Sequence, residues 1–150
     1  MRLTICFCFD RLIKAARGIK VRLRPHHFMC IQFFTGHGYD ERFASHMKDV
    51  ISDLNDDKKI TVTNGCDDIC SHCPNMKNNT CIHEKKVSHL DRKVLENTAV
   101  CYGKELIWKD GVSLVYEHIL KRDMFHKICG ECEWYELCKR IREERIKDNG

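Results

Sequence analysis

Two cysteine clusters, far apart in the chain, carry the residues best suited to chemistry. Each cluster holds a Cys-x2-Cys pair followed by a third cysteine. The members are Cys70, Cys73 and Cys81 in the central cluster and Cys129, Cys132 and Cys138 in the late cluster. Two intervening residues let a turn aim both sulfurs at one metal while its backbone N–H groups face the metal or cluster sulfide. The spacing therefore predicts that these cysteines ligate a metal or a metal cofactor.

The number and spacing of the thiols favour iron over zinc. A zinc ribbon separates its two Cys-x2-Cys pairs by about 15–20 residues, whereas 55 residues lie between Cys73 and Cys129. More than four thiolates also exceed one tetrahedral zinc, and sulfur-rich sets suit clusters. We expect one or two iron–sulfur clusters, most simply 4Fe–4S, with zinc as the alternative. A set of three cysteines lacks a fourth ligand, for which the candidates are Cys30, Cys66, His26 and His27.

His26 and His27 have a second interpretation as catalytic residues. Cys30 follows them at helical spacing, so the imidazoles could ligate metal or transfer protons beside a cluster with an open iron. Capping or core packing explains a histidine pair equally well. Cys66-x3-Cys70-x2-Cys73 also has the spacing of radical S-adenosylmethionine enzymes, but the 77 residues after Cys73 are too few for their partial barrel.

The composition is typical of a folded protein, and the cysteine count favours a reducing compartment. Of 150 residues, 43% are hydrophobic and 32% charged, and the 11 cysteines are an odd number that cannot all pair within one chain. The apolar run at residues 3–9 is too short for a membrane helix and lacks a small-residue cleavage site. We expect a cytoplasmic protein with no membrane contact. Residues 1–18 form a basic extension, and residues 19–150 one cysteine-rich domain.

The net charge of +4 is weak support for nucleic-acid binding, because it counts every cysteine as neutral. Four thiolates around a 4Fe–4S core leave a net negative site, so metal loading would cancel the apparent basicity. Nucleic acid is therefore not expected as a partner. A redox partner protein is compatible with the sequence, and nothing in it specifies the oligomeric state.

The elements that must position the clusters begin with two strands. Residues 19–24 alternate apolar and cationic side chains, and residues 60–63 repeat the alternation in a shorter run. Two helices are expected between them, a short one over residues 26–34 and a longer one capped by Asp40. Such a crossover predicts parallel strands, whose following loops meet at one edge. This pairing brings His26, His27 and Cys30 near the central cysteine cluster.

The rest of the chain is expected to be largely helical. An apolar stripe from Val87 to Thr98 predicts an amphipathic helix, and Val112–Leu120 and the segment after Trp134 predict two more. Residues 108–111 have the composition of a turn, and Asp123 is placed to cap a short turn leading to Cys129. The predicted class is α+β and mainly helical, with a small two-stranded sheet, about five helices and cysteine-rich metal-binding loops.

Four motifs together resemble an uncharacterised family of small bacterial and archaeal proteins, over about residues 19–145. They are Leu23-Arg24-x-His26-His27-x2-Cys30, Gly36-x-Gly38-Tyr39, Asp68-Ile69-Cys70-x2-Cys73-Pro74, and Ile128-Cys129-x2-Cys132-x-Trp134 closing at Cys138. Members of that domain of unknown function are thought to bind iron–sulfur clusters. The resemblance implies that class of cofactor and no defined reaction or substrate.

Three functions follow from these patterns. The first is an iron–sulfur protein used in electron transfer or redox sensing. The second is a zinc-stabilised interaction module, touching nucleic acid through the cationic face of Lys20, Arg22 and Arg24. The third is a small iron–sulfur enzyme with an open iron, in which His26 or His27 is the acid–base partner.

Overall fold

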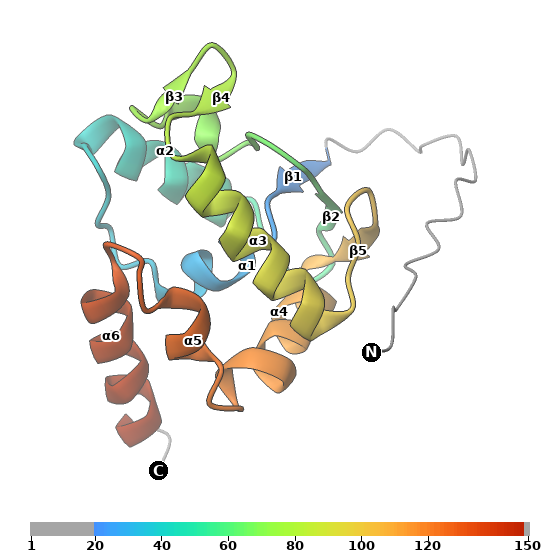
Figure 1. Ribbon diagram of the computed structural model, residues 1–150, viewed down its shortest axis with the longest axis vertical. Helices are drawn as coiled ribbons and strands as arrows, with labels where there is room; N and C mark the ends of the chain where they lie inside the picture. Colours follow the sequence, from blue (N-terminus) through green and yellow to red (C-terminus); the bar gives the residue numbers. More distant parts are fainter. Residues whose placement is uncertain (1–19, 149–150) are drawn as a thin grey trace.

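The computed structural model describes residues 20–148, which form a mixed three-stranded sheet and six α-helices (Figure 1). The strands are β1 (Val21–Leu23), β2 (Lys59–Val62) and β5 (Glu105–Ile107), in the order β1-β2-β5. β1 pairs with β2 in parallel, as the crossover predicts, and β2 pairs with β5 antiparallel. Val21 and Leu23 are buried while Arg22 between them is exposed, so the alternation does set the buried face.

The crossover from β1 to β2 contains the expected helices. α1 (His27–Cys30) continues into the 3₁₀ turn η1 (Ile31–Phe33), and α2 (Glu41–Ser52) follows. α2 begins where predicted, because the Asp40 carboxylate accepts a hydrogen bond from the backbone N–H of Phe43 at 2.7 Å. Phe43 and Met47 on its apolar stripe are buried against the core.

Replacing Asp40 by alanine should lower the free energy of unfolding by about 1 kcal/mol, because the first turn of α2 loses its side-chain acceptor. Asp49→Ala, on the exposed face of the same helix, is the matched control and should change stability by less than about 0.5 kcal/mol. Urea unfolding of the two variants measures the difference. Equal stability would show that the cap does not hold the helix end.

After β2 the chain passes the short turn η2 (Cys70–His72) and a hairpin, then enters the longest helix. The hairpin strands are β3 (Met76–Lys77) and β4 (Thr80–Cys81), and the helix is α3 (Glu84–Thr98). In Figure 1 the hairpin stands above the start of α3, which crosses in front of α1. Three helices then complete the chain: α4 (Trp108–Val115) with the π turn η3 (Tyr116–Leu120), α5 (Phe125–Cys129) and α6 (Tyr135–Asp148).

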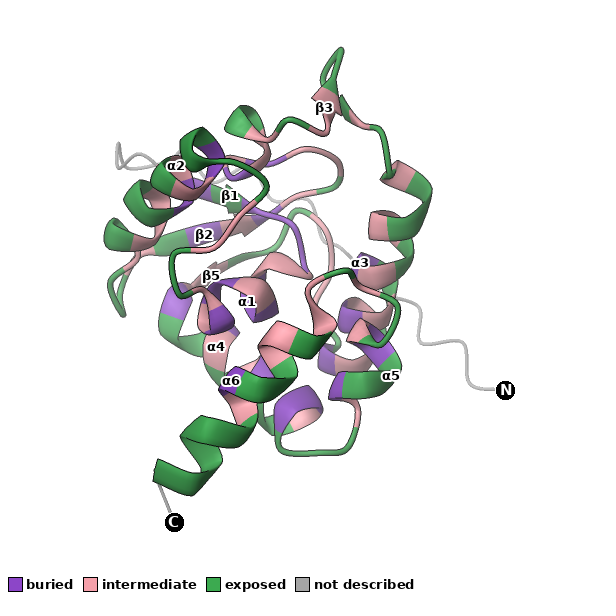
Figure 2. Cartoon of the chain, turned by 90° about the vertical axis from the view of Figure 1, so that its left-hand side faces the viewer, coloured by how far each residue is buried: buried purple, intermediate pink, exposed green. Residues whose placement is uncertain are grey.

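The core lies where α1 meets the sheet. Leu23 and Ile60 are fully buried, and Phe28 and Met29 of α1 are nearly so. Figure 2 shows buried residues gathered around α1 and the strands, while the hairpin and the outer turns of α6 are exposed. Burial of this kind supplies most of the folding free energy, and it fixes α1 between the two regions of the chain that carry the cysteine clusters.

The α+β, mainly helical class is confirmed, with differences in detail. The sheet has a third strand, β5, in addition to the two expected. Residues 108–111 begin α4 and do not form a turn, so that prediction is wrong. Asp123 does not cap α5 either, because Met124 holds that position and the Asp123 carboxylate accepts from the His126 ring at 3.2 Å.

The predicted basic extension, residues 1–18, lies outside the residues that the structure describes. Within residues 20–148, no helix combines the length and the apolar character that crossing a membrane requires.

Candidate metal centre

The loops that follow β1 and β2 are tied together by two aspartates. Asp68 accepts the backbone N–H of Arg22 at 2.8 Å, and Asp67 accepts that of Arg24 at 2.6 Å. The parallel pairing of β1 and β2 puts both loops at the same edge of the sheet. Residues 24–30 therefore lie beside residues 66–70, as the strand topology predicts.

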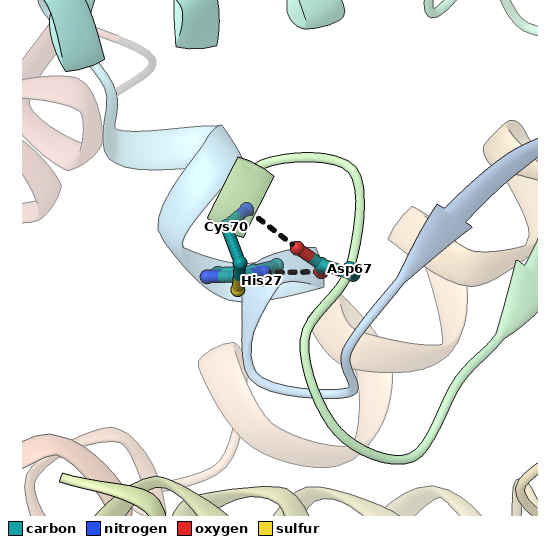
Figure 3. A group of neighbouring side chains, drawn as sticks. All are labelled: His27, Asp67 and Cys70. Carbon is teal, nitrogen blue, oxygen red and sulfur yellow. Dashed lines mark hydrogen bonds and ion pairs between the residues drawn. The ribbon is translucent and has the colours of Figure 1, made fainter. Parts of the chain in front are cut away.

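Asp67 anchors His27 (Figure 3). One carboxylate oxygen accepts the Nδ1–H of His27 at 2.5 Å, and the other accepts the backbone N–H groups of Ile69 and Cys70 at 3.0 and 3.1 Å. Burial alone would raise the pKa of Asp67, but the His27 ring and these N–H groups outweigh it and hold the pKa well below its usual range. Since Nδ1 carries the proton, Nε2 of neutral His27 keeps its lone pair on the far side of the ring.

His27, Asp67 and Cys70 could together hold a metal ion, because their ligand atoms lie within 4.8 Å of one another. Asp67 already accepts four hydrogen bonds, which occupy the lone pairs of both oxygens. It is thus better placed to orient His27 than to bind metal itself, in the manner of the carboxylates behind metal-bound histidines. His27 and Cys70 remain as the direct donors of this group.

A second buried carboxylate, Asp91 of α3, orients His26. It accepts the Nδ1–H of His26 at 2.6 Å and the Nε–H of Arg24 at 2.8 Å, and its side chain is fully buried. Burial and the neighbouring His27 lower the pKa of His26, against the pull of Asp91. The guanidinium of Arg24 also binds Glu84 through two contacts of 2.9 Å. This network fixes α3 to the loop before α1.

A cavity of about 280 Å³ lies between these elements. His26 and His27 line it, together with seven free cysteines from both halves of the chain. These cysteines are Cys30, Cys70, Cys73, Cys81, Cys129, Cys132 and Cys138. The structure thus brings all six predicted ligands, and Cys30, to the wall of one space, although the clusters are 55 residues apart between Cys73 and Cys129.

The free thiols form two groups of four, according to which of them influence one another's pKa. Burial and then the thiols of Cys129, Cys132 and Cys138 raise the pKa of Cys30. Cys66, which does not line the cavity, interacts with Cys70 and Cys81, and Cys73 with Cys81 and Cys66. We name the sets the first thiol group (Cys66, Cys70, Cys73 and Cys81) and the second thiol group (Cys30, Cys129, Cys132 and Cys138).

Cys30 lines the same cavity as the central cluster, whereas the thiols that raise its pKa belong to the late cluster. α1 therefore spans the two groups, with His27 beside Cys70 at its start and Cys30 at its end. Cys101 belongs to neither group: it does not line the cavity and is disulfide-bonded.

Several of these thiols have a pKa raised above the ordinary value of cysteine. Burial is the largest cause, and it raises the pKa of Cys129 to about 12 and that of Cys138 to about 11, with the thiol of Cys132 adding to both. The pKa of Cys70 is raised further still, by burial and then by the charge of Asp67. Metal uptake must then displace protons from these groups.

Three aromatic side chains meet at one part of the cavity wall. Tyr39, from the turn before α2, donates a 2.7 Å hydrogen bond to Glu133 and packs edge-on against Trp134 at 5.5 Å between ring centroids. The His37 ring lies 5.2 Å from Trp134. All three rings line the cavity.

The sequence patterns missed Arg24, Asp67 and Asp91 as site residues. Asp91 could have been found, because it falls on the apolar face of α3 between Val87 and Val94, where a lone acid must be paired. Asp67 lies inside the Cys66–Cys70 run but has no spacing that sets it apart from Asp68. The alternation of Val21 and Leu23 assigns Arg24 to the exposed side with Arg22, but Arg24 follows the end of β1 and is buried. It therefore does not belong to the exposed cationic face that the sequence suggests for Lys20, Arg22 and Arg24.

A family model described as a protein of unknown function, DUF1284, matches residues 38–138. No curated protein and no solved structure matches the chain. The matched residues include α2, the central cysteine cluster, α3 and the late cluster up to Cys138.

Proposed function

We propose that this chain, which belongs to the DUF1284 family of proteins of unknown function, binds two iron–sulfur clusters on cysteine thiolates. One observation carries the proposal: thiols from both halves of the chain line a single cavity of about 280 Å³. A structural zinc ion is closed in by its own four ligands and needs no such space. A cluster of iron and sulfide does need it.

The donor chemistry fits two 4Fe–4S clusters, each of which takes four cysteine thiolates. In this assignment the first thiol group holds one cluster and the second thiol group the other. Cys66 and Cys30 are the fourth ligands that the three-cysteine motifs lack. No histidine is then needed as a ligand, and His26 and His27 are free to hold hydrogen bonds or protons beside the clusters.

Such clusters supply one-electron redox chemistry, so electron transfer or redox sensing is the use that we propose. The residues of the chain contribute the surroundings. Arg24 brings a positive charge to the cavity wall, and the rings of Tyr39 and Trp134 add aromatic surface to it. These are the features by which a protein sets a cluster potential.

The proposal is tested by purifying and reconstituting the chain without oxygen, then measuring iron, acid-labile sulfide, zinc and the visible spectrum. We expect a brown protein with equal iron and sulfide. A colourless protein that holds neither iron nor sulfide after reconstitution would rule it out. Zinc alone, retained until a chelator unfolds the chain, would instead establish the interaction-module alternative.

A catalytic role is the second candidate, and the carboxylate-backed imidazoles favour it. His26 and His27 each have Nδ1 held by a buried aspartate, which leaves Nε2 facing the cavity side as an acid or base. In the variant His27→Ala, an intact cluster spectrum with altered reactivity toward small oxidants would support this role. Loss of the cluster on the first thiol group would instead indicate that His27 is one of its ligands.

A further inference from the structure

We infer that an acidic electron-transfer protein docks on the exposed surface beside Cys81, which we name the hairpin surface (Lys77, Ile82, His83, Lys85 and Lys86). The inference rests on the proposed function and adds the place and charge of the partner. The surface is formed by the β3–β4 hairpin and the first turn of α3, which adjoin in Figure 1.

The hairpin surface is cationic and unpaired. Lys77, Lys85 and Lys86 are exposed, and none of the ion pairs or side-chain hydrogen bonds found in residues 20–148 involves them. The acid nearest in sequence, Glu84, is already bound to Arg24. Charges left unpaired in one area steer an oppositely charged partner, more than they stabilise the fold.

An apolar side chain stands within these charges. Ile82 is 58% exposed and is one of few large hydrophobic side chains so far out on the described surface. Its backbone N–H is held by the carbonyl of Asn75 at 2.8 Å, so the hairpin presents it in a fixed position. An exposed apolar residue with a charged rim has the make-up of a small transient interface.

The surface also adjoins the first thiol group directly. Ile82 follows Cys81 in the chain, and His83 and Lys86 line the cavity that holds the thiols. A partner here lies next to a cluster ligand. A redox centre held by the first thiol group would accept one electron from the partner's donor. The partner would be oxidised by that one electron, and no bond would form or break.

The surface around the second thiol group carries charges of both signs. Glu131 and Glu133 are exposed beside Cys132, and Lys127 and Lys139 are exposed beside Cys129 and Cys138. A surface of mixed sign attracts an acidic partner less than the hairpin surface, where no exposed acid stands among the lysines.

The experiment measures binding of a purified acidic flavodoxin, used as the probe, to Lys85→Glu/Lys86→Glu and to the control Lys59→Glu/Lys109→Glu. All four lysines are exposed, and the two double substitutions change the net charge by the same amount. The control residues lie at the start of β2 and of α4. Acidic residues suit the first turn of a helix, so the Lys85 and Lys86 changes should not disturb α3.

At low salt, Kd for the probe should rise at least about tenfold in the hairpin variant and much less in the control, and the difference should vanish in about 0.5 M salt. The rate of one-electron reduction by the flavodoxin should follow Kd. Equal weakening in both variants, salt-independent binding, or no binding to the parent chain would overturn the inference. The iron and sulfide content of the same samples shows whether clusters are bound. It therefore distinguishes failure of the docking inference from failure of the proposed function.

Discussion

Replacing Cys129 and Cys132 by serine is expected to remove about half of the bound iron and sulfide, because the first thiol group still has its four cysteines. Cys70→Ser/Cys73→Ser should remove the other half, and the four changes together should leave a colourless protein. Iron and sulfide content per chain after anaerobic reconstitution measures each outcome. Near-complete loss in either double variant would mean that the two sets form one site.

The grouping itself is tested by Cys30. Its thiol lies with Cys129, Cys132 and Cys138, so Cys30→Ser combined with Cys129→Ser should lose no more iron than Cys129→Ser alone. Cys30→Ser combined with Cys70→Ser should instead lose both clusters. The reverse pattern would place Cys30 with the first thiol group, where the strand topology alone suggests it.

Replacing Arg24 by methionine should cost about 3–5 kcal/mol of unfolding free energy, the usual effect of removing one partner from a buried ion pair. The Arg24 side chain is 1% exposed, and the change leaves the buried Asp91 carboxylate with His26 as its remaining side-chain partner. Arg24 also holds Glu84, so α3 loses its attachment to the loop before α1. Chemical denaturation of the metal-free protein measures the loss.

Arg22→Met is the matched control for Arg24→Met. Arg22 also pairs with an aspartate, Asp68, but its side chain is 56% exposed and the pair is worth no more than about 1 kcal/mol. If the two variants lose equal stability, the Arg24 network is not what joins α3 to the site. The Arg24→Met/Asp91→Leu double variant should recover part of the loss, since no charge remains buried without its partner.

The sequence predicted the helices and strands that bury one apolar face, because that face leaves a periodic pattern in the sequence. The alternation in β1 and the apolar stripe of α2 are set by burial, and both elements appear where expected. β5 was missed because Glu105–Ile107 is too short to show a period. Residues 108–111 resemble a turn through Gly111, but a Cβ there would lie 2.4 Å from Cε1 of Phe28. Glycine is present for close helix packing, which only the tertiary structure reveals.

For the site, the sequence identifies the candidate metal ligands, but not which thiols group together or which carboxylates orient the histidines. Cys-x2-Cys spacing is local and marks the ligand candidates directly. The division of the thiols depends on α1 reaching both groups, a tertiary feature that places Cys30 beside Cys129. The carboxylates behind His26 and His27 are 65 and 40 residues away in sequence, which no local pattern connects.

Native mass spectrometry of the anaerobically reconstituted chain tests the central claim most directly. Two 4Fe–4S clusters on eight thiolates predict a dominant species carrying about eight irons and about eight sulfides per chain. A dominant species with two zinc ions and no sulfide, or with no metal at all, would contradict it.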